Sequence, residues 1–268
     1  MYNYYALYKL LLCKRKEASS EQMKLNGRLM MIVNKIPYCR ILTDVGTDHA
    51  YIPIYAVMNG LCEKALALDL RTGPLKMADG NIRRYKLENS IETRLGNGLE
   101  PVLPSECDVI VVAGMGGLLM TDILSASVEK AQKAQLLLLQ PNNAADALRK
   151  WLYENGFDII EEELVLDAGK LYCMISAKWT GVAVIKDEFA YFIGERLLEG
   201  KDPLLQSYFS RKLKELEVII EGRSRSDPDK SRDAAGMSGM DTAACIYIRN
   251  RLLDYIANNS LKGGDSSW

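Results

Sequence analysis

The chain has 268 residues, 48 % of them hydrophobic, and its 34 Lys and Arg nearly balance 35 Asp and Glu for a formal net charge of −1. This length accommodates one large or two smaller domains, and the balanced charge excludes nucleic-acid binding through an overall basic excess. No apolar run approaches the roughly 18 residues of a membrane span, so we expect no membrane insertion.

Residues 1–22 have the character of an N-terminal extension. An apolar stretch there precedes the basic run Lys14-Arg15-Lys16, which reverses the order found in a secretory signal peptide. The six cysteines form no C-x-x-C pair and His49 is the only histidine, so no metal site is expected. Reduced thiols in a cytoplasmic protein are the simplest interpretation.

The first strand of the predicted sheet follows a short helix that ends before Pro37. An apolar run from residue 41 closes on Asp44, and Val45-Gly46 opens a turn into an apolar helix that begins near Ile52. Ligands of open parallel sheets bind beyond the carboxyl ends of the strands, where such a turn lies. Gly46 lets the backbone approach a ligand closely because it has no Cβ.

This turn lacks the glycines of a dinucleotide-binding fingerprint. Thr47-Asp48-His49-Ala50 stands where further glycines of G-x-G-x-x-G would be, which argues against a cradled pyrophosphate. The turn suits S-adenosylmethionine instead, because Asp44 and Asp48 would stabilise its ammonium and sulfonium groups. Taken alone, the stretch is equally compatible with an ordinary strand-to-helix turn.

The next two strands also end in residues suited to a nucleoside. The strand predicted at 64–70 ends in Asp69-Leu70, and an acid at this place accepts hydrogen bonds from ribose hydroxyls. A helix follows over 73–85, where Pro74 suits the first turn. The strand predicted at 90–95 leads into Gly96-Asn97-Gly98, a turn that could lie against an adenine ring or be a plain glycine-rich turn.

Two further strands complete the parallel part of the sheet. The strand at 107–112 is continuously apolar, as in strands covered on both faces, and stops at Ala113-Gly114-Met115-Gly116-Gly117. The three glycines leave room for a planar substrate or the cofactor, and one helix is predicted from there to about residue 133. The strand at 136–139 ends in Gln140-Pro141-Asn142-Asn143 and precedes a helix that stops at Asn155-Gly156.

The end of the sheet distinguishes between related folds. Residues 157–166 and 171–179 are strand-like and are joined by the turn Asp167-Ala168-Gly169-Lys170, so they form an antiparallel hairpin. A parallel sheet closed by a hairpin is the pattern of class I methyltransferases, whereas a dinucleotide-binding sheet continues strand, helix, strand. The sequence predicts a Rossmann-like α/β methyltransferase fold with a seven-stranded sheet.

The chain becomes helical after residue 180. Helices predicted at 186–198 and 204–220 would form an antiparallel, coiled-coil-like pair, and residues 222–240 are predicted to be a mobile loop. A last helix is predicted at 243–257 and a disordered tail at 262–268. We therefore expect an extension at 1–22, a methyltransferase domain at 23–180 and a helical domain at 181–268.

Three motifs together resemble the TrmK family of bacterial tRNA (adenine(22)-N1)-methyltransferases. They are the stretch from Thr43 to Ile54, Ala113-Gly114-Met115-Gly116-Gly117, and Gln140-Pro141-Asn142. The resemblance extends in order from about Met23 to about Ile220. It implies a methyltransferase domain followed by a helical coiled-coil domain, S-adenosylmethionine as methyl donor, and N1 of a tRNA adenine as acceptor.

The resemblance also assigns the cofactor contacts. Asp44, Gly46, Asp48 and His49 would border the methionine half, Asp69 would hold the ribose, and Asn97 and Gly98 would face the adenine. The full set predicted to bind the cofactor comprises Asp44, Gly46, Thr47, Asp48, His49, Asp69, Leu70, Gly96, Asn97, Gly98, Ala113, Gly114, Met115 and Gly116. Two positions depart from the family: Asn97 stands where Asp is more frequent, and Cys173 where Glu is usual. An Asn side chain still accepts and donates hydrogen bonds.

The proposed chemistry asks for positioning rather than a strong base. Adenine N1 carries a free lone pair at neutral pH, and the cofactor supplies the reactive group. The target base would be hydrogen-bonded by Asp48, His49 or Asn142 and packed against Tyr51 or Met115. Alternatively, His49 could cap its helix and Tyr51 could be a core residue.

A tRNA substrate must be held through its backbone. Basic residues near the pocket, on the second helix of the sheet and on the second C-terminal helix are candidates: Lys24, Arg28, Arg83, Arg84, Lys86, Arg211, Lys212 and Lys214. We expect a monomer or weak homodimer. Two other classes stay open, a methyltransferase acting on a small molecule or protein and a cofactor-binding protein without turnover; a dehydrogenase is disfavoured by the missing glycines and the hairpin.

Overall fold

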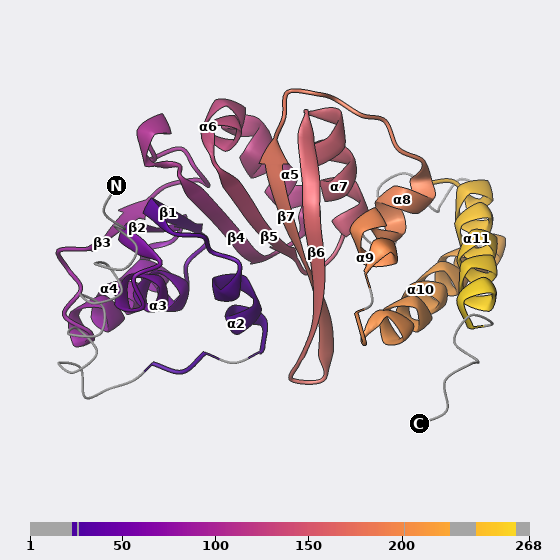
Figure 1. Cartoon of the computed structure of the whole chain (residues 1–268), viewed down its shortest axis with the longest axis horizontal. Helices are drawn as coiled ribbons and strands as arrows, with labels where there is room; N and C mark the ends of the chain where they lie inside the picture. The colour runs from indigo at the N-terminus through magenta and orange to yellow at the C-terminus, as the bar shows by residue number, and fades with distance from the viewer. Residues whose placement is uncertain (1–22, 26, 201, 226–239, 261–268) are drawn as a thin grey trace, which may run out of the picture. The chain divides into compact units, whose positions relative to one another are not determined.

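The structure is a computed structural model that describes residues 23–25, 27–200, 202–225 and 240–260. Seven strands form one sheet in the order β3-β2-β1-β4-β5-β7-β6 (Figure 1). The strands are β1 (Cys39–Val45), β2 (Cys62–Asp69), β3 (Ile91–Leu95), β4 (Val109–Met115), β5 (Leu136–Pro141), β6 (Phe157–Asp167) and β7 (Lys170–Trp179). The predicted α/β fold with a closing antiparallel hairpin is confirmed.

Helices precede, separate and follow these strands. They are α2 (Gly27–Asn34), α3 (Tyr51–Met58), α4 (Thr72–Arg84), the 3-10 turn η1 (Pro104–Glu106), α5 (Gly117–Ala126), α6 (Val128–Lys133), α7 (Ala145–Glu154), α8 (Glu188–Ile193), α9 (Glu195–Glu199), α10 (Leu205–Arg225) and α11 (Thr242–Ser260). The chain divides into two compact units, one with the residues up to Ala113 and Ile123–Leu139, the other with Gly114–Asp122 and the residues from Gln140 onward. The boundary predicted near residue 180 stays a prediction.

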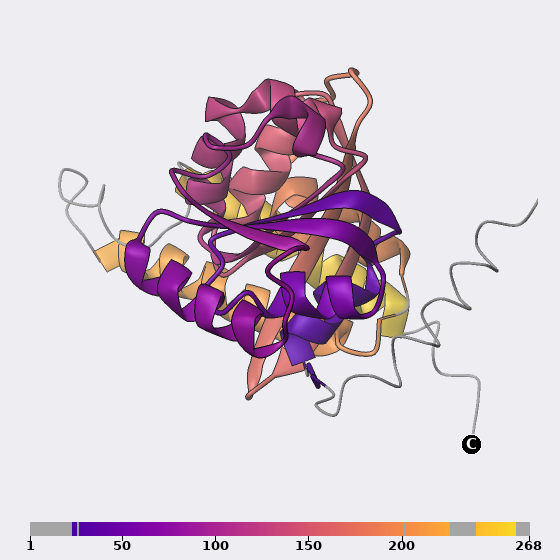
Figure 2. The ribbon, with the colours of Figure 1, turned by 90° about the vertical axis from the view of Figure 1, so that its left-hand side faces the viewer.

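The first unit is built on parallel strands that are apolar along their length. β1 pairs with β2 so that Asp44 lies opposite Ala67, and β2 pairs in parallel with β3. Helices α3 and α4 contact these strands, and Figure 2 shows α4 running alongside them. Leu42 and Leu68 are fully buried, as expected for strands that are covered on both faces. This packing fixes where β1 and β2 end, and so where Asp44 and Asp69 lie.

The second unit contains the hairpin. β6 and β7 pair antiparallel from Phe157 opposite Trp179 to Asp167 opposite Lys170. The two turn residues, Ala168 and Gly169, have φ of 48° and 76°, which matches the right-handed twist of the two strands. Helices α7 and α9 contact β6.

Two helices that the sequence predicts as continuous are broken. The helix expected to reach residue 133 ends at Ala126, and Ser127 adopts a non-helical φ of −138° before α6. The helix expected over 186–198 is interrupted by Gly194, whose φ is 95°. A side chain at Gly194 would collide with the Glu162 carboxylate, so only glycine fits at this break.

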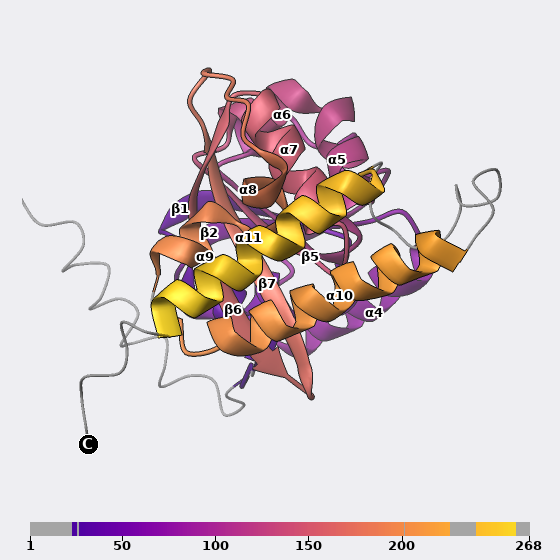
Figure 3. The same cartoon turned by 90° about the vertical axis from the view of Figure 1, so that its right-hand side faces the viewer.

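The predicted coiled-coil-like pair is also different in the structure. The long helix α10 packs against α11, and Figure 3 shows the two side by side. Because Gly194 divides 186–198 into two short helices, that segment cannot provide a long partner for α10. Helix α10 extends to Arg225, so 222–225 is helical and not part of a loop. The remainder of the predicted loop at 226–239, the extension at 1–22 and the tail at 262–268 lie outside the described residues.

A buried ion pair joins α7 to β6. The side chains of Arg149 and Glu162 are both 0 % exposed, with Nε and Oε1 2.7 Å apart. The Arg149 guanidinium also donates to the carbonyl oxygens of Tyr191 and Phe192 at 2.8 and 3.2 Å. Its Nη2 lies 3.5 Å from the Tyr208 hydroxyl on α10. One side chain thus connects a strand, α8 and α10.

Other expectations concern the cysteines, metals and membranes. The five cysteines within the described residues are free and buried. In the same part of the chain, no group of three or more His, Cys, Asp or Glu could hold a metal ion. None of the described helices is long and apolar enough to cross a membrane.

Candidate active site

The turn after β1 is pinned to the neighbouring strand. Gly46 has a φ of 77°, and its N–H donates to the Leu68 carbonyl oxygen at 2.8 Å. The Thr47 N–H donates to the same oxygen at 2.7 Å. Because a positive φ favours glycine, Gly46 allows the chain to leave β1 while both amides stay paired.

Asp44 is a carboxyl group held in an apolar setting. It is only 5 % exposed, and burial raises its pKa to about 6 against a smaller opposing effect of the nearby Thr47 hydroxyl. That hydroxyl makes no regular hydrogen bond; Thr47 Oγ1 and Glu162 Oε2 are the two buried side-chain oxygens without a partner among the described residues. A buried acid beside an unpaired hydroxyl is an arrangement that a bound cation with hydrogen-bonding groups would complete.

The three residues predicted to contact the target base in this unit lie together. The His49 and Tyr51 rings are stacked, with centroids 5.0 Å apart and planes 15° apart. His49 Nε2 lies 3.3 Å from Asp48 Oδ2, and Asp48 is 71 % exposed. Tyr51 is 38 % exposed, so the alternative of a core tyrosine is wrong. His49 does not cap α3, because the N-cap is Ala50 in a left-handed conformation without a side-chain bond.

Asp69 ends β2 as predicted and is 7 % exposed. Its Oδ1 accepts a hydrogen bond from the Arg71 N–H at 2.8 Å, while Oδ2 accepts none from the residues that the structure describes. This free oxygen fits a ribose hydroxyl. Leu70 beside it is 65 % exposed.

The Gly96-Asn97-Gly98 turn joins the end of β3 to the end of β2. The Gly96 N–H donates to the Asp69 carbonyl oxygen at 3.1 Å. Gly98 has a φ of 57°, and a Cβ there would lie 2.7 Å from Ile123 Cγ2. Asn97 is exposed. The structure thus groups Asp44, Asp69 and this turn at the carboxyl ends of three adjacent parallel strands.

Ala113 is the last residue of this stretch in the first unit, and Gly114, Met115, Gly116 and Asn142 belong to the second unit. β4 continues through Met115, so Gly114 and Met115 end the strand and do not follow it as predicted. The Asn142 side chain donates from Nδ2 to the Gly114 carbonyl oxygen at 2.7 Å. The backbone N–H of Asn142 donates to the Met115 carbonyl oxygen, also at 2.7 Å. Asn142 therefore holds the end of β4 in place, and its second amide hydrogen has no acceptor within the described part of the chain.

Gly117 packs against the loop that follows Asn142. Its N–H donates to the Asn143 carbonyl oxygen at 2.9 Å, and a Cβ at this position would collide with the Ala144 carbonyl oxygen. We expect Gly117→Ala to force this loop away and to lower activity and thermal stability together. Gly73→Ala is the matched control, because no atom lies within 4 Å of a Cβ there. Equal melting temperatures for the two variants would contradict the packing described.

Sequence reasoning missed three residues of these loops. Ala50 and Ala144 both adopt left-handed conformations, with φ of 54° and 47°, and each immediately precedes a helix. Alanine at such φ is strained, and no residue type signals it in advance. Asn143 contributes through its backbone, and the Asn142-Asn143 repeat was the available signal.

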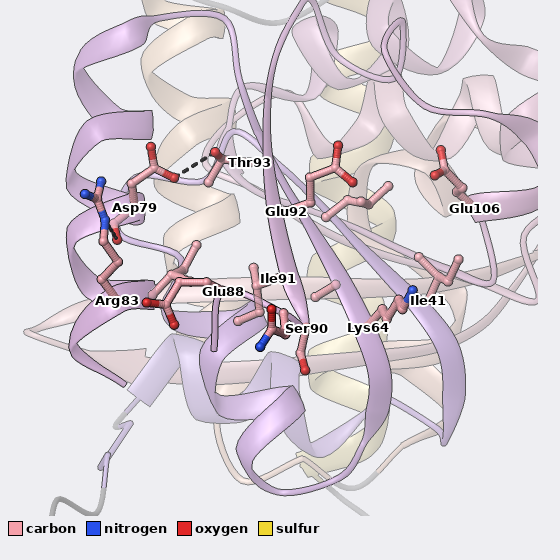
Figure 4. Close-up of a pocket in the computed structure, with 14 residues that line it drawn as sticks. Ile41, Lys64, Asp79, Arg83, Glu88, Ser90, Ile91, Glu92, Thr93 and Glu106 are labelled. Carbon is pink, nitrogen blue, oxygen red and sulfur yellow. Dashed lines mark hydrogen bonds between the residues drawn. The ribbon is translucent and has the colours of Figure 1, made fainter. Parts of the chain in front are cut away.

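A separate cavity lies away from these strand ends. A cavity of about 640 Å³ follows the edge strand β3 and reaches α4 (Figure 4). Its lining includes Lys64, Glu92 and Asp79, which accepts a hydrogen bond from Thr93 at 2.7 Å. None of the predicted cofactor or base contacts lines it.

The basic residues predicted to hold tRNA separate into two kinds. Lys24, Arg83, Arg84, Lys86, Arg211 and Lys214 are exposed, whereas Arg28 is half-buried. Lys212 is wrong as a phosphate contact, because its side chain is buried and its Nζ lies 4.1 Å from the centre of the Phe192 ring. Arg211 and Lys214 border a surface depression on α10 with Ser210 and Gln206.

Known proteins are similar to this chain over most of its length. Residues 25–175 match the family model described as "Methyltransferase domain". The tRNA (adenine(22)-N(1))-methyltransferase of Bacillus subtilis is 31 % identical over 212 residues, which cover 76 % of this chain and 88 % of that protein.

Solved structures agree with this match. The crystal structure of the B. subtilis m1A22 tRNA methyltransferase TrmK is 30 % identical, with a TM-score of 0.70, over 88 % of this chain and 97 % of that one. The Streptococcus pneumoniae protein Sp1610 in complex with S-adenosyl-L-methionine is 28 % identical, with a TM-score of 0.72, over 85 % and 98 %. The chain belongs to the family of tRNA (adenine(22)-N1)-methyltransferases.

Proposed function

We propose that this protein transfers a methyl group from S-adenosylmethionine to N1 of an adenine in tRNA, adenine 22 by analogy with its relative, giving 1-methyladenosine. The observation that carries the proposal is a buried acid with an unpaired hydroxyl beside it, Asp44 and Thr47, at the carboxyl end of β1. A related protein of known structure binds this cofactor. When bound, the cofactor supplies the methyl group on a positively charged sulfur.

The first unit offers groups that bind and orient the cofactor. Asp44 would offset the charge of its ammonium group, and the Thr47 hydroxyl would gain the hydrogen bond that it lacks. Asp69 Oδ2 would accept from a ribose hydroxyl, and the exposed Asn97 would meet the adenine edge. Gly46 leaves the backbone open to close approach.

The target adenine needs recognition more than deprotonation. Its N1 lone pair attacks directly, and the product carries a positive charge that an acceptor for the N6 hydrogens would stabilise. Asp48 is exposed and acidic, and its neighbours His49 and Tyr51 form a stacked aromatic pair against which a base can pack. Met115 and Asn142 are proposed as further contacts of the target base.

Replacing Asp48 by Ala should lower turnover about 10- to 100-fold, the usual cost of losing a hydrogen bond to a charged group, with a much smaller change in cofactor affinity. Steady-state kinetics with tRNA and calorimetric titration of the cofactor measure the two effects. Asp254→Ala, at an exposed acid on α11, is the control. An unchanged rate in Asp48→Ala would remove this residue from the mechanism.

Further aspects of the reaction belong to the same proposal. The exposed basic side chains of Arg211 and Lys214 would contact the tRNA backbone. A cytoplasmic location follows from a tRNA substrate. We also propose a catalytic domain at 23–180 and a helical domain at 181–268, in agreement with the family match over 25–175. A monomer or weak homodimer suffices, because no residue of a second copy is required.

The experiment is incubation with labelled methyl donor and unmodified bulk tRNA, followed by digestion to nucleosides. We expect label in 1-methyladenosine alone. Label in another nucleoside would overturn the assignment of the acceptor atom. Label in a small molecule or protein, or cofactor binding without transfer, would favour one of the two other classes named above.

A further inference from the structure

Two consecutive leucines at the start of α5 are exposed without an evident structural reason. Leu118 is 49 % exposed and Leu119 is 50 % exposed, while the next residue, Met120, is fully buried. Helices of globular proteins usually turn apolar residues inward. A single exposed leucine needs no explanation, but an adjacent pair at the tip of a helix does.

The tip that carries these leucines is held rigidly. The Gly117 N–H donates to Asn143 at 2.9 Å, and the Met120 N–H donates to the Gly116 carbonyl oxygen at 3.0 Å. The Thr121 hydroxyl donates to the Gly117 carbonyl oxygen at 2.9 Å. Any substituent at Gly117 would strike Ala144. The leucine pair is therefore fixed relative to Asn142, which is bonded to Gly114 in the same unit.

The leucine pair follows Met115 closely in the chain and belongs to the same unit as Asn142. Both Met115 and Asn142 are proposed to contact the target base. An adenine stacked within folded tRNA cannot present N1 to a methyl donor until it leaves its stack, which costs a few kcal/mol. Proteins that unstack bases do so with rigid apolar side chains, leucine among them, inserted between base steps. Charged side chains could not replace the lost stacking contacts, whereas the side chains of Leu118 and Leu119 are apolar and uncharged.

We propose that Leu118 and Leu119 form an apolar wedge that takes the place of the target adenine in the tRNA stack while that base is methylated. The inference rests on the proposed function and adds the step by which the base becomes accessible. The occupant of this surface is the pair of tRNA bases that flank the target. The leucines are positioning residues, and they do not touch the transferred methyl group.

The test compares the double variant Leu118→Ala/Leu119→Ala with the wild type on two substrates. One is the folded tRNA, and the other is the same tRNA with the pairing partners of the target adenine changed so that it is already unpaired. We expect the variant to lose at least about tenfold in kcat/KM on the folded tRNA and less than about twofold on the unpaired one. Leu166→Ala, at a 58 % exposed residue of the hairpin, should match the wild type on both.

Equal losses on both substrates, or no loss on either, would overturn the wedge. If the alanine pair also reduces cofactor binding, Leu118→Gln/Leu119→Gln preserves the side-chain length and is tested in the same way. The wild-type enzyme separates this proposal from the preceding one. If the wild type methylates neither tRNA, the proposed function is refuted. If the wild type is active but the variants lose the same activity on both tRNAs, only the wedge is refuted.

Discussion

Arg149→Met is expected to lower the free energy of unfolding by about 3–5 kcal/mol, the typical cost of leaving one member of a buried ion pair alone. The substitution removes the partner of the Glu162 carboxylate, which is 0 % exposed. It also leaves the carbonyl oxygens of Tyr191 and Phe192 without the donor that they now have. Urea unfolding followed by circular dichroism measures the loss.

The double variant Arg149→Met/Glu162→Leu separates the pair from the packing around it. Removing both charges eliminates the unpaired carboxylate, so we expect the double variant to be more stable than Arg149→Met. Lys150→Met, at the exposed neighbour of Arg149 on the same helix, should change stability by less than about 0.5 kcal/mol. A single variant within about 1 kcal/mol of the wild type would contradict the burial of this ion pair.

Asp44→Asn is expected to weaken binding of S-adenosylmethionine about 10- to 100-fold at pH 7.5, as for loss of a hydrogen bond to a charged group. Burial raises the pKa of Asp44 to about 6, so the carboxyl group is ionised at pH 7.5 and mostly protonated at pH 5. Only the ionised form offsets the cofactor's ammonium charge. Wild-type affinity should therefore fall about tenfold between pH 7.5 and pH 5, and calorimetric titration at the two values measures this.

The ionisation of Asp44 should have the opposite effect on the stability of the cofactor-free protein, which we expect to fall as the pH rises. Its pKa is raised from 3.8 to about 6 on folding, so the folded state binds more protons than the unfolded state between these values. The contribution of Asp44 to stability consequently falls as pH rises through this window, by about 3 kcal/mol in total. Asp44→Asn should abolish both pH dependences. If its affinity for the cofactor kept the wild-type pH profile, Asp44 would not be the group responsible.

The sheet could be predicted from sequence because its strands are apolar in an unambiguous way. Runs such as 107–112 and 136–139 are buried on both faces, and each ends in a turn of small or polar residues. The hairpin was identifiable because Ala168-Gly169 leaves room for only a tight turn. These are local signals, and tertiary structure does not contradict them.

The helical region was less predictable, because tertiary contacts there decide the outcome. Gly194 interrupts a periodic pattern through its positive φ, and only glycine fits there because Glu162, distant in sequence, occupies the space that a side chain would need. Lys212 is buried because its helix turns that residue towards Phe192, although a lysine between Arg211 and Leu213 gives no sign of this. Periodicity identified α10 but could not identify α11 as its partner.

For the candidate site, the residue types were predictable from the sequence, but their burial, hydrogen bonding and pKa were not. Asp44 and Asp69 lie at the strand ends where the motif pattern predicts them. The unpaired Thr47 hydroxyl and the raised pKa of Asp44 depend on how deeply the turn is buried, which no local pattern reveals. The use of Asn142 to hold Gly114 likewise depends on the separation of two strand ends.

Methyl transfer to a single defined adenine tests the central claim most directly. An unmodified tRNA transcript with adenine at position 22 is compared with one carrying guanosine there, using labelled S-adenosylmethionine and primer extension, which stops at 1-methyladenosine. We predict one methyl group for each adenine-containing transcript, a stop at position 22, and no transfer to the guanosine transcript. Equal labelling of both transcripts, or no labelling of either by a protein that binds the cofactor, would contradict the assignment.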